Sequence, residues 1–73
     1  MSKITLYTKT KCPKCDVVKN ELKRHNVEYT EVYVDSEPLA RQLLIDAGHR
    51  SVPVIYRGDK AISLKELIKN TGA

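Results

Sequence analysis

The pattern of apolar and polar residues predicts four short strands. Lys3–Thr8 alternates apolar and polar side chains and is rich in β-forming residues, and Val27–Val34 has the same composition. Val52–Tyr56 is a third candidate and Lys60–Ile62 a short fourth. Arg57-Gly58-Asp59 supplies a turn between the last two segments, so we expect them to form an antiparallel hairpin.

Apolar residues at helical spacing, together with start and stop signals, predict three helices. The first begins at Pro13, because a helix does not need an N–H at its first position, and it runs to about residues 24–25. Asp35 or Ser36 caps the second helix, which ends at Gly48. The side chains expected to face the core are Cys15, Val18 and Leu22 in the first helix, with Val17 as a further candidate, Leu39, Leu43, Leu44 and Ala47 in the second, and Leu64, Leu67 and Ile68 in the third.

Ser63 is the predicted cap of the last helix. The four strands and three helices then follow one another in the order β-α-β-α-β-β-α, which is an α/β fold. The first two strands are joined by a helix and should lie parallel through a right-handed crossover. This arrangement gives a four-stranded mixed sheet flanked by three helices that cover both faces. We expect residues 1–73 to form one domain, because glycine and proline are scattered singly and no linker or repeat interrupts the chain.

Composition narrows the partners expected for this domain. No apolar run approaches the length of a membrane span and the N-terminus lacks the apolar segment of a signal peptide, so we expect a cytoplasmic protein without a membrane partner. The net charge of +4 permits nucleic-acid binding, but the only aromatic residues are four Tyr and no arginine-rich tract is present. A nucleic-acid-binding domain is therefore a weaker alternative, which would require binding that falls steeply with salt.

Basic residues cluster around the two cysteines of the chain. Lys9, Lys11, Lys14 and Lys19 surround them, with Asp16 as the only acid among these positions. Such a cluster can stabilise a thiolate and attract an anionic partner, although a solvated lysine face is the plainer explanation.

Cys12 and Cys15 are separated only by Pro-Lys. If Cys12 caps the first helix, its Cα lies about 5–6 Å from that of Cys15, close to the separation that a disulfide prefers. A structural disulfide across so short a loop would restrict the unfolded chain little. Structural zinc would also need His25 and His49, and His25 lies about 15 Å from Cys15 along the helix. The spacing therefore favours a redox pair over either structural role.

Two motifs resemble those of the glutaredoxin family, which includes the NrdH-type redoxins. The first is Tyr7-Thr8-Lys9-Thr10-Lys11-Cys12-Pro13-Lys14-Cys15, and the second is Ser51-Val52-Pro53-Val54. The resemblance covers nearly the whole chain. Together with a C-x-x-C at the junction of the first strand and first helix, it implies a thioredoxin-like fold and a thiol–disulfide oxidoreductase.

By this resemblance, Cys12 is the exposed nucleophile and Cys15 the resolving thiol. The position of Cys12 at a helix N-terminus supports the same order, because unpaired N–H groups favour a thiolate there. Lys11 and Lys14 add positive charge beside it, and together with Pro13 they are the residues expected to tune its reactivity.

The resemblance also implies a binding groove beside the cysteines. Pro53 should follow a cis peptide bond and shape this groove, which leaves the backbone of Val52, next to Ser51, free to pair with an extended peptide or glutathione. Lys9 matches a family lysine that contacts the glycyl carboxylate of glutathione.

The resemblance implies a monomer that reduces protein disulfides or glutathione-mixed disulfides, with no tightly bound cofactor and with glutathione as its reductant. Ribonucleotide reductase is the target that small redoxins of this family often serve. One alternative is a module in which two subunits hold an iron–sulfur cluster through Cys12 and glutathione, although Pro13 and the second cysteine argue against it.

Two departures from the family pattern concern glutathione. Lys14 stands where glutaredoxins carry an aromatic residue, and Ile62-Ser63-Leu64 stands where they carry a glycine turn that holds the γ-glutamyl end. The Trp-Ser-Gly-Phe signature of NrdH-type redoxins is also absent. We therefore expect weakened glutathione recognition, and an NrdH-like redoxin recharged by thioredoxin reductase is the main alternative.

Overall fold

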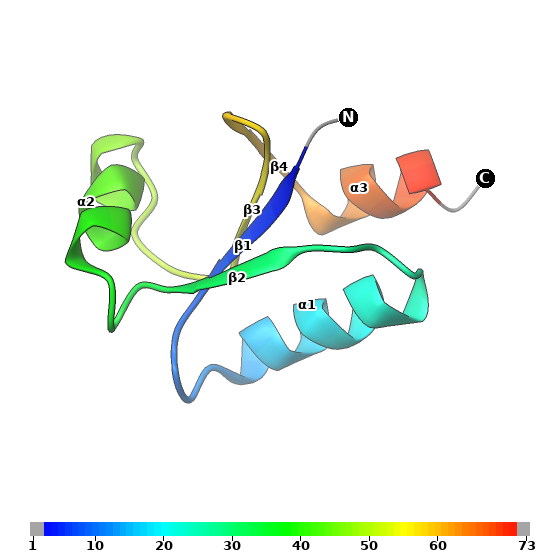
Figure 1. Cartoon of the computed structure of the whole chain (residues 1–73), viewed down its shortest axis with the longest axis horizontal. Helices are drawn as coiled ribbons and strands as arrows, with labels where there is room; N and C mark the ends of the chain where they lie inside the picture. Colours follow the sequence, from blue (N-terminus) through cyan, green and yellow to red (C-terminus); the bar gives the residue numbers. More distant parts are fainter. Residues whose placement is uncertain (1–2, 72–73) are drawn as a thin grey trace.

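A computed structural model describes residues 3–71, and its elements follow the predicted order β-α-β-α-β-β-α (Figure 1). They are β1 (Ile4–Thr8), α1 (Pro13–Arg24), β2 (Thr30–Tyr33), α2 (Pro38–Asp46), β3 (Val54–Arg57), β4 (Lys60–Ile62) and α3 (Leu64–Thr71). The strands β2 and β3 are shorter at their starts than Val27–Val34 and Val52–Tyr56 predicted. Val27 instead closes the end of α1, where its N–H donates to the carbonyl of Leu22 at 2.9 Å.

β1 is a central strand of a four-stranded mixed sheet with the order β2-β1-β3-β4. It pairs with β2 in parallel, with Tyr7 opposite Val32, and with β3 in antiparallel, with Tyr7 opposite Val54. β3 and β4 form the predicted antiparallel hairpin. Because β3 runs against β1, the residues before β3 lie beside the end of β1. The segment that contains Pro53 and the loop that leads to Cys12 therefore meet at one edge of the sheet.

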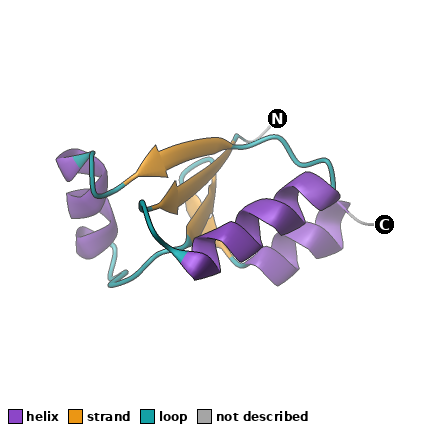
Figure 2. Cartoon of the chain, turned by 90° about the horizontal axis from the view of Figure 1, so that it is seen from below, coloured by secondary structure: helices purple, strands orange, loops and turns teal. Residues whose placement is uncertain are grey.

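The main core lies between the sheet and the helices α1 and α3. Burial alternates along β1, so Ile4, Leu6 and Thr8 face this core. Figure 2 shows α1 and α3 together on one side of the strands and α2 on the other, which confirms helices on both faces. The buried cluster comprises Ile4, Leu6, Val18, Leu22, Ile55 and Leu67, with Val27, Tyr29, Ile62 and Leu64 packed against it.

The predicted buried side of α1 is confirmed for Cys15, Val18 and Leu22. Val17 is wrong, because its side chain is 60% exposed. One residue advances an α-helix by about 100°, so Val17 points away from the face that carries Val18.

The start of α3 follows the sequence signal. Ser63 Oγ accepts a hydrogen bond from the N–H of Glu66 at 3.1 Å, which confirms the predicted cap. Leu67 is buried and Leu64 packs against the core, as predicted. The side chain of Ile68 lies outside the described residues.

The predicted buried stripe of α2 is largely wrong. Only Leu44 is buried, whereas Leu39 is 86% exposed, Leu43 is 49% exposed and Ala47 is exposed. The helix lies towards one end of the sheet rather than over its middle (Figure 1), and within it only Leu44 is buried and only Ala40 is half-buried. Gly48 ends α2 with φ of +91°, a conformation that glycine adopts readily.

The predicted caps of α2, Asp35 and Ser36, are also wrong. The N-cap is Glu37, whose side chain makes no capping hydrogen bond. The carboxylate of Asp35 instead accepts a hydrogen bond from the backbone N–H of Thr10 at 3.1 Å. A side chain expected to start a helix therefore contacts the loop that precedes Cys12.

Candidate active site

The Cys12–Cys15 disulfide lies at the N-terminus of α1. Cys12 is the N-cap, with φ of −129° and ψ of 99°, and Pro13 opens the helix, as predicted. The Cα atoms of the two cysteines are 5.2 Å apart, within the range expected from the spacing. The backbone N–H of Cys15 donates to Sγ of Cys12 at 3.2 Å. In the reduced protein, the same donor would stabilise a thiolate on Cys12.

The two cysteines differ in their exposure to solvent. Cys12 is 7% exposed and Cys15 is 0% exposed. In this disulfide form, Cys12 is less exposed than predicted, because its sulfur is bonded to Cys15 and lies over the first turn of α1. Of the two, Cys12 nevertheless keeps the greater exposure.

Positive charge surrounds the disulfide, though less of it than the sequence indicated. Lys9, Lys11 and Lys14 are exposed and stand close to the cysteines along the chain. Lys19 instead interacts with β2, where its Nζ lies 3.3 Å from the Tyr33 hydroxyl and 3.7 Å from the Glu31 carboxylate. Burial lowers the pKa of Lys19, but the hydrogen bond to Tyr33 and the charge of Glu31 outweigh it, so the net shift is upward.

The loop between β1 and Cys12 has an unusual backbone. Lys11 has φ of +47°, a left-handed conformation that a residue with a side chain rarely adopts. One residue earlier, the Thr10 N–H is bonded to Asp35. Hydrogen bonds from Thr10, first from its side chain and then from its backbone N–H, lower the pKa of the Asp35 carboxyl below its usual value, and the nearby charge of Lys9 adds a smaller effect in the same direction.

Pro53 follows a cis peptide bond, as the resemblance predicted. Its neighbour Val54 pairs with Tyr7 of β1, which places Pro53 at the edge of the sheet from which the Cys12 loop emerges. Val52 and Pro53 are both half-buried.

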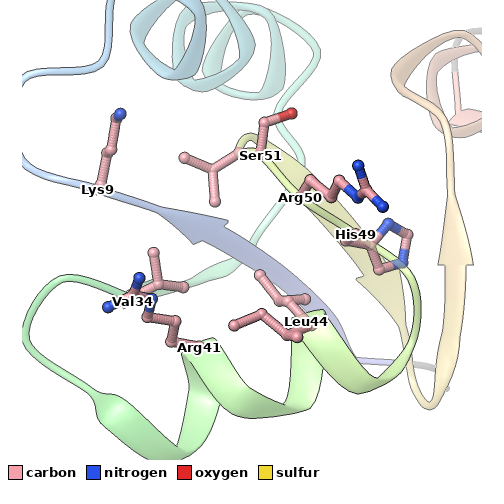
Figure 3. Close-up of a pocket in the computed structure, with 9 residues that line it drawn as sticks. Lys9, Val34, Arg41, Leu44, His49, Arg50 and Ser51 are labelled. Atoms are coloured by element: carbon pink, nitrogen blue, oxygen red, sulfur yellow. The ribbon is translucent and has the colours of Figure 1, made fainter.

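A basic cleft of about 240 Å³ lies beside this segment (Figure 3). It joins residues from the loop after β1, from α2 and from the loop before β3. Of the binding residues predicted from the sequence, Lys9, Ser51 and Val52 line it, whereas Pro53 lines a separate groove. Sequence reasoning missed Arg41 and Arg50, which have no local signal because only the fold brings them to Lys9. The full lining is Lys9, Val34, Arg41, Leu44, Ile45, His49, Arg50, Ser51 and Val52, and none of these nine is acidic.

A second groove, of about 450 Å³, lies on the other side of Pro53. Ile62, Ser63 and Leu64 line it, at the position where glutaredoxins would carry their glycine turn, and most of the other lining residues are apolar. Glu66 is the only acid in its lining. The segment around Pro53 therefore separates a basic cleft from a mostly apolar groove. The two cysteines line neither hollow.

Within residues 3–71, no group of three or more His, Cys, Asp or Glu side chains is arranged to hold a metal ion. None of the helices in that range has the length and apolar character needed to cross a bilayer.

Comparisons with known proteins agree with this geometry. The glutaredoxin family model matches residues 4–62. Among curated proteins, the glutaredoxin-like protein NrdH of Lactococcus lactis is 35% identical over 60 residues, which cover 82% of this chain and 83% of that protein. A glutaredoxin of Pseudomonas aeruginosa is also 35% identical over 60 residues, covering 81% and 71% of the two chains.

Among solved structures, the Escherichia coli NrdH-redoxin superposes with a TM-score of 0.81 at 28% identity, over 89% of this chain and 93% of that one. It is described as a glutaredoxin-like protein with a thioredoxin-like activity profile. The mixed sheet, the flanking helices and these matches confirm a thioredoxin-like fold. This chain therefore belongs to the glutaredoxin family and is a thiol–disulfide oxidoreductase.

Proposed function

We propose that this protein reduces protein disulfides, with Cys12 as the attacking thiolate and Cys15 as the resolving thiol. The observation that carries the assignment is the geometry of the disulfide at the start of α1. Sγ of Cys12 accepts the N–H of Cys15 and keeps some exposure, whereas Cys15 is fully buried. An intermolecular disulfide can therefore form on Cys12, and the neighbouring thiol of Cys15 is placed to displace it.

The reaction proceeds in two exchanges that balance. The Cys12 thiolate attacks one sulfur of the substrate disulfide, and the other substrate sulfur leaves as a thiolate that takes up a proton. Cys15 then loses its proton and attacks Sγ of Cys12, which releases the second substrate thiol. The substrate gains two electrons and two protons, and the protein ends with the Cys12–Cys15 disulfide.

We infer that the substrate chain lies in an extended conformation along residues 51–53. The Val52 backbone can pair with it, and Pro53 shapes the surface beside the disulfide. Lys9, Arg41 and Arg50 would then receive carboxylates from the substrate, since no acid lines their cleft. This arrangement favours anionic partners.

For the electron donor, we propose a thioredoxin-reductase-type flavoenzyme as the better reductant and glutathione as the second candidate. Similarity to proteins named NrdH, and to an NrdH-redoxin with a thioredoxin-like activity profile, supports the first. The apolar groove and the charge of Glu66 support it as well, because they offer little to a γ-glutamyl carboxylate. The basic cleft supports glutathione, whose glycyl carboxylate Lys9 and Arg41 could bind.

The same similarity to NrdH proteins leads us to propose ribonucleotide reductase as a target and the cytoplasm as the location. We also propose that residues 1–73 act as a single monomeric domain without a tightly bound cofactor. A cluster-binding module is less well supported, because Cys15 lies within disulfide distance of Cys12 and competes with iron for its sulfur.

The test offers the oxidised protein two electron sources in parallel. One reaction contains NADPH and thioredoxin reductase, the other NADPH, glutathione and glutathione reductase, and NADPH consumption is followed with a protein disulfide as substrate. We expect faster turnover with thioredoxin reductase. Faster turnover with glutathione would reverse the choice of reductant, and no turnover in either reaction would contradict the proposed function.

A further inference from the structure

The contact between Asp35 and Thr10 joins segments that are 25 residues apart. Thr10 belongs to the loop between β1 and Cys12, and Asp35 follows the end of β2. A second hydrogen bond lies next to this contact, in which the Val34 N–H donates to the Thr8 carbonyl at 2.8 Å. Two successive links, at Thr8 and Thr10, therefore hold the start of the loop against the end of β2.

The backbone between Thr10 and the start of α1 is constrained. Lys11 occupies the left-handed region at φ of +47°, and Cys12 then returns to an extended conformation as the N-cap of α1. A non-glycine residue stays in the left-handed region only when its surroundings hold it there. The bond from Thr10 to Asp35 is the side-chain contact immediately before this residue, so it is placed to supply that constraint.

We propose that Asp35 is a positioning residue for the attacking sulfur. It acts through Thr10 and Lys11, and it keeps Cys12 aligned so that its Sγ receives the N–H of Cys15. This inference rests on the proposed role of Cys12. The side chain of Asp35 is hydrogen-bonded to Thr10 and not to a cysteine, and its charge also interacts with Lys9.

The charge of Asp35 and its hydrogen bond act on Cys12 in opposite directions. A carboxylate near the loop opposes the positive charge of Lys9, Lys11 and Lys14 and adds to that of Asp16, so its charge alone disfavours a thiolate. The bond to Thr10 favours the thiolate by holding the donor geometry. The carboxylate is ionised at neutral pH, and hydrogen bonds from the Thr10 side chain and backbone N–H lower its pKa, so the link is lost only as the pH falls through that lowered pKa.

These opposite signs allow two substitutions to separate the effects. Asp35→Asn removes the charge but keeps an oxygen that can accept the Thr10 N–H. Asp35→Ala removes both. Asp59→Asn, in the exposed turn between β3 and β4, removes one negative charge far along the sheet and serves as the control.

The measurement is the pH profile of Cys12 alkylation in the reduced proteins, with the modified cysteine identified by mass mapping. For Asp35→Asn we expect a midpoint equal to or below that of the wild type. For Asp35→Ala we expect a higher midpoint than for Asp35→Asn, with alkylation at mildly acidic pH about two- to fivefold slower, as the loss of one modest hydrogen bond implies. Asp59→Asn should match the wild type.

Coinciding profiles for Asp35→Ala and Asp35→Asn would overturn the proposal, even if both variants had lost stability in thermal unfolding. The shift of the Thr10 amide proton provides a direct check, because in the wild type it should follow a titration with a midpoint below 3.8, the usual carboxyl value. Alkylation needs neither a protein substrate nor a reductase. The result therefore stands apart from the turnover test of the proposed function.

Discussion

Leu44→Ala should detach α2 from the rest of the protein and weaken substrate binding without changing the disulfide chemistry. Leu44 is 4% exposed and is the only buried side chain that the structure records on α2. It lies one turn after Arg41, and both residues line the basic cleft. We therefore expect the position of Arg41 to depend on the packing of Leu44, since the only other covered residue of the helix is the half-buried Ala40.

The size of the effect follows from the surroundings of Leu44. Leu→Ala changes in closed cores cost about 2–5 kcal/mol. Leu44 has exposed neighbours at Leu43 and Ile45 and an open cleft on one side, so we expect the lower end, about 2 kcal/mol. A domain of this length holds only about 4–11 kcal/mol in total, so this is a substantial loss. If this loss of stability is confined to α2, the helix opens roughly thirtyfold more often.

Amide hydrogen exchange can measure that opening directly. The N–H groups of Ala47 and His49 donate to the carbonyls of Leu43 and Leu44 at 3.1 and 2.8 Å, so they report whether the end of α2 is formed. In Leu44→Ala these amides should exchange about thirtyfold faster, while those of α1 change little. The apparent KM for an anionic disulfide substrate should rise, with kcat nearly unchanged.

Leu39→Ala is the matched control, because it removes the same atoms from an 86% exposed position on the same helix. It should alter exchange and stability by less than about 0.5 kcal/mol. Equal exchange in the two variants would refute the view that Leu44 anchors α2. Equal acceleration in α1 and α2 of Leu44→Ala would show that the helix does not open as a local unit.

Three further predictions concern the cysteines. Cys12→Ser should abolish disulfide reduction and Cys15→Ser should trap mixed disulfides, which non-reducing mass spectrometry detects; trapping in Cys12→Ser instead would exchange their roles. The Cys12 thiol should titrate well below about 8.5, and Lys14→Glu should raise its midpoint by replacing an attractive charge with a repulsive one. Thiolate absorbance against pH measures this, and an unchanged midpoint would assign the stabilisation to the helix end alone. The reduction potential should lie nearer about −200 to −230 mV than about −270 mV, because the lysines and helix end stabilise the reduced form. Equilibration against glutathione redox buffers measures it, and a value at or below about −270 mV would contradict this reasoning and exclude glutathione as an effective reductant.

Local signals were sufficient where the structure depends on neighbouring residues. Pro13 marked the start of α1, Ser63 marked the start of α3, and Arg57-Gly58-Asp59 marked the hairpin turn. The cis bond before Pro53 was predicted only through the family resemblance, because a lone proline in sequence does not distinguish the two isomers.

Predictions failed where the outcome depends on distant parts of the chain. The apolar spacing of α2 shows which side chains could be buried together, but not that Leu44 alone among them becomes buried. Asp35 has the sequence context of a helix cap, and only the parallel pairing of β1 and β2 brings it to Thr10. Arg41 and Arg50 reach Lys9 only after α2 and the loop before β3 have been placed against the sheet.

These distant contacts share one origin, which is the end of β1. Its parallel pairing with β2 brings Asp35 to the loop before Cys12, and its antiparallel pairing with β3 brings Pro53 to the same edge. A change in the register of either pairing would therefore separate the disulfide from its supporting or binding residues while leaving the motif Cys12-Pro13-Lys14-Cys15 intact. Reactivity at Cys12 should consequently be sensitive to substitutions that disturb β1, such as those at the fully buried Leu6. A family motif in the sequence thus identifies the chemistry, while the strand pairings determine whether the site is assembled.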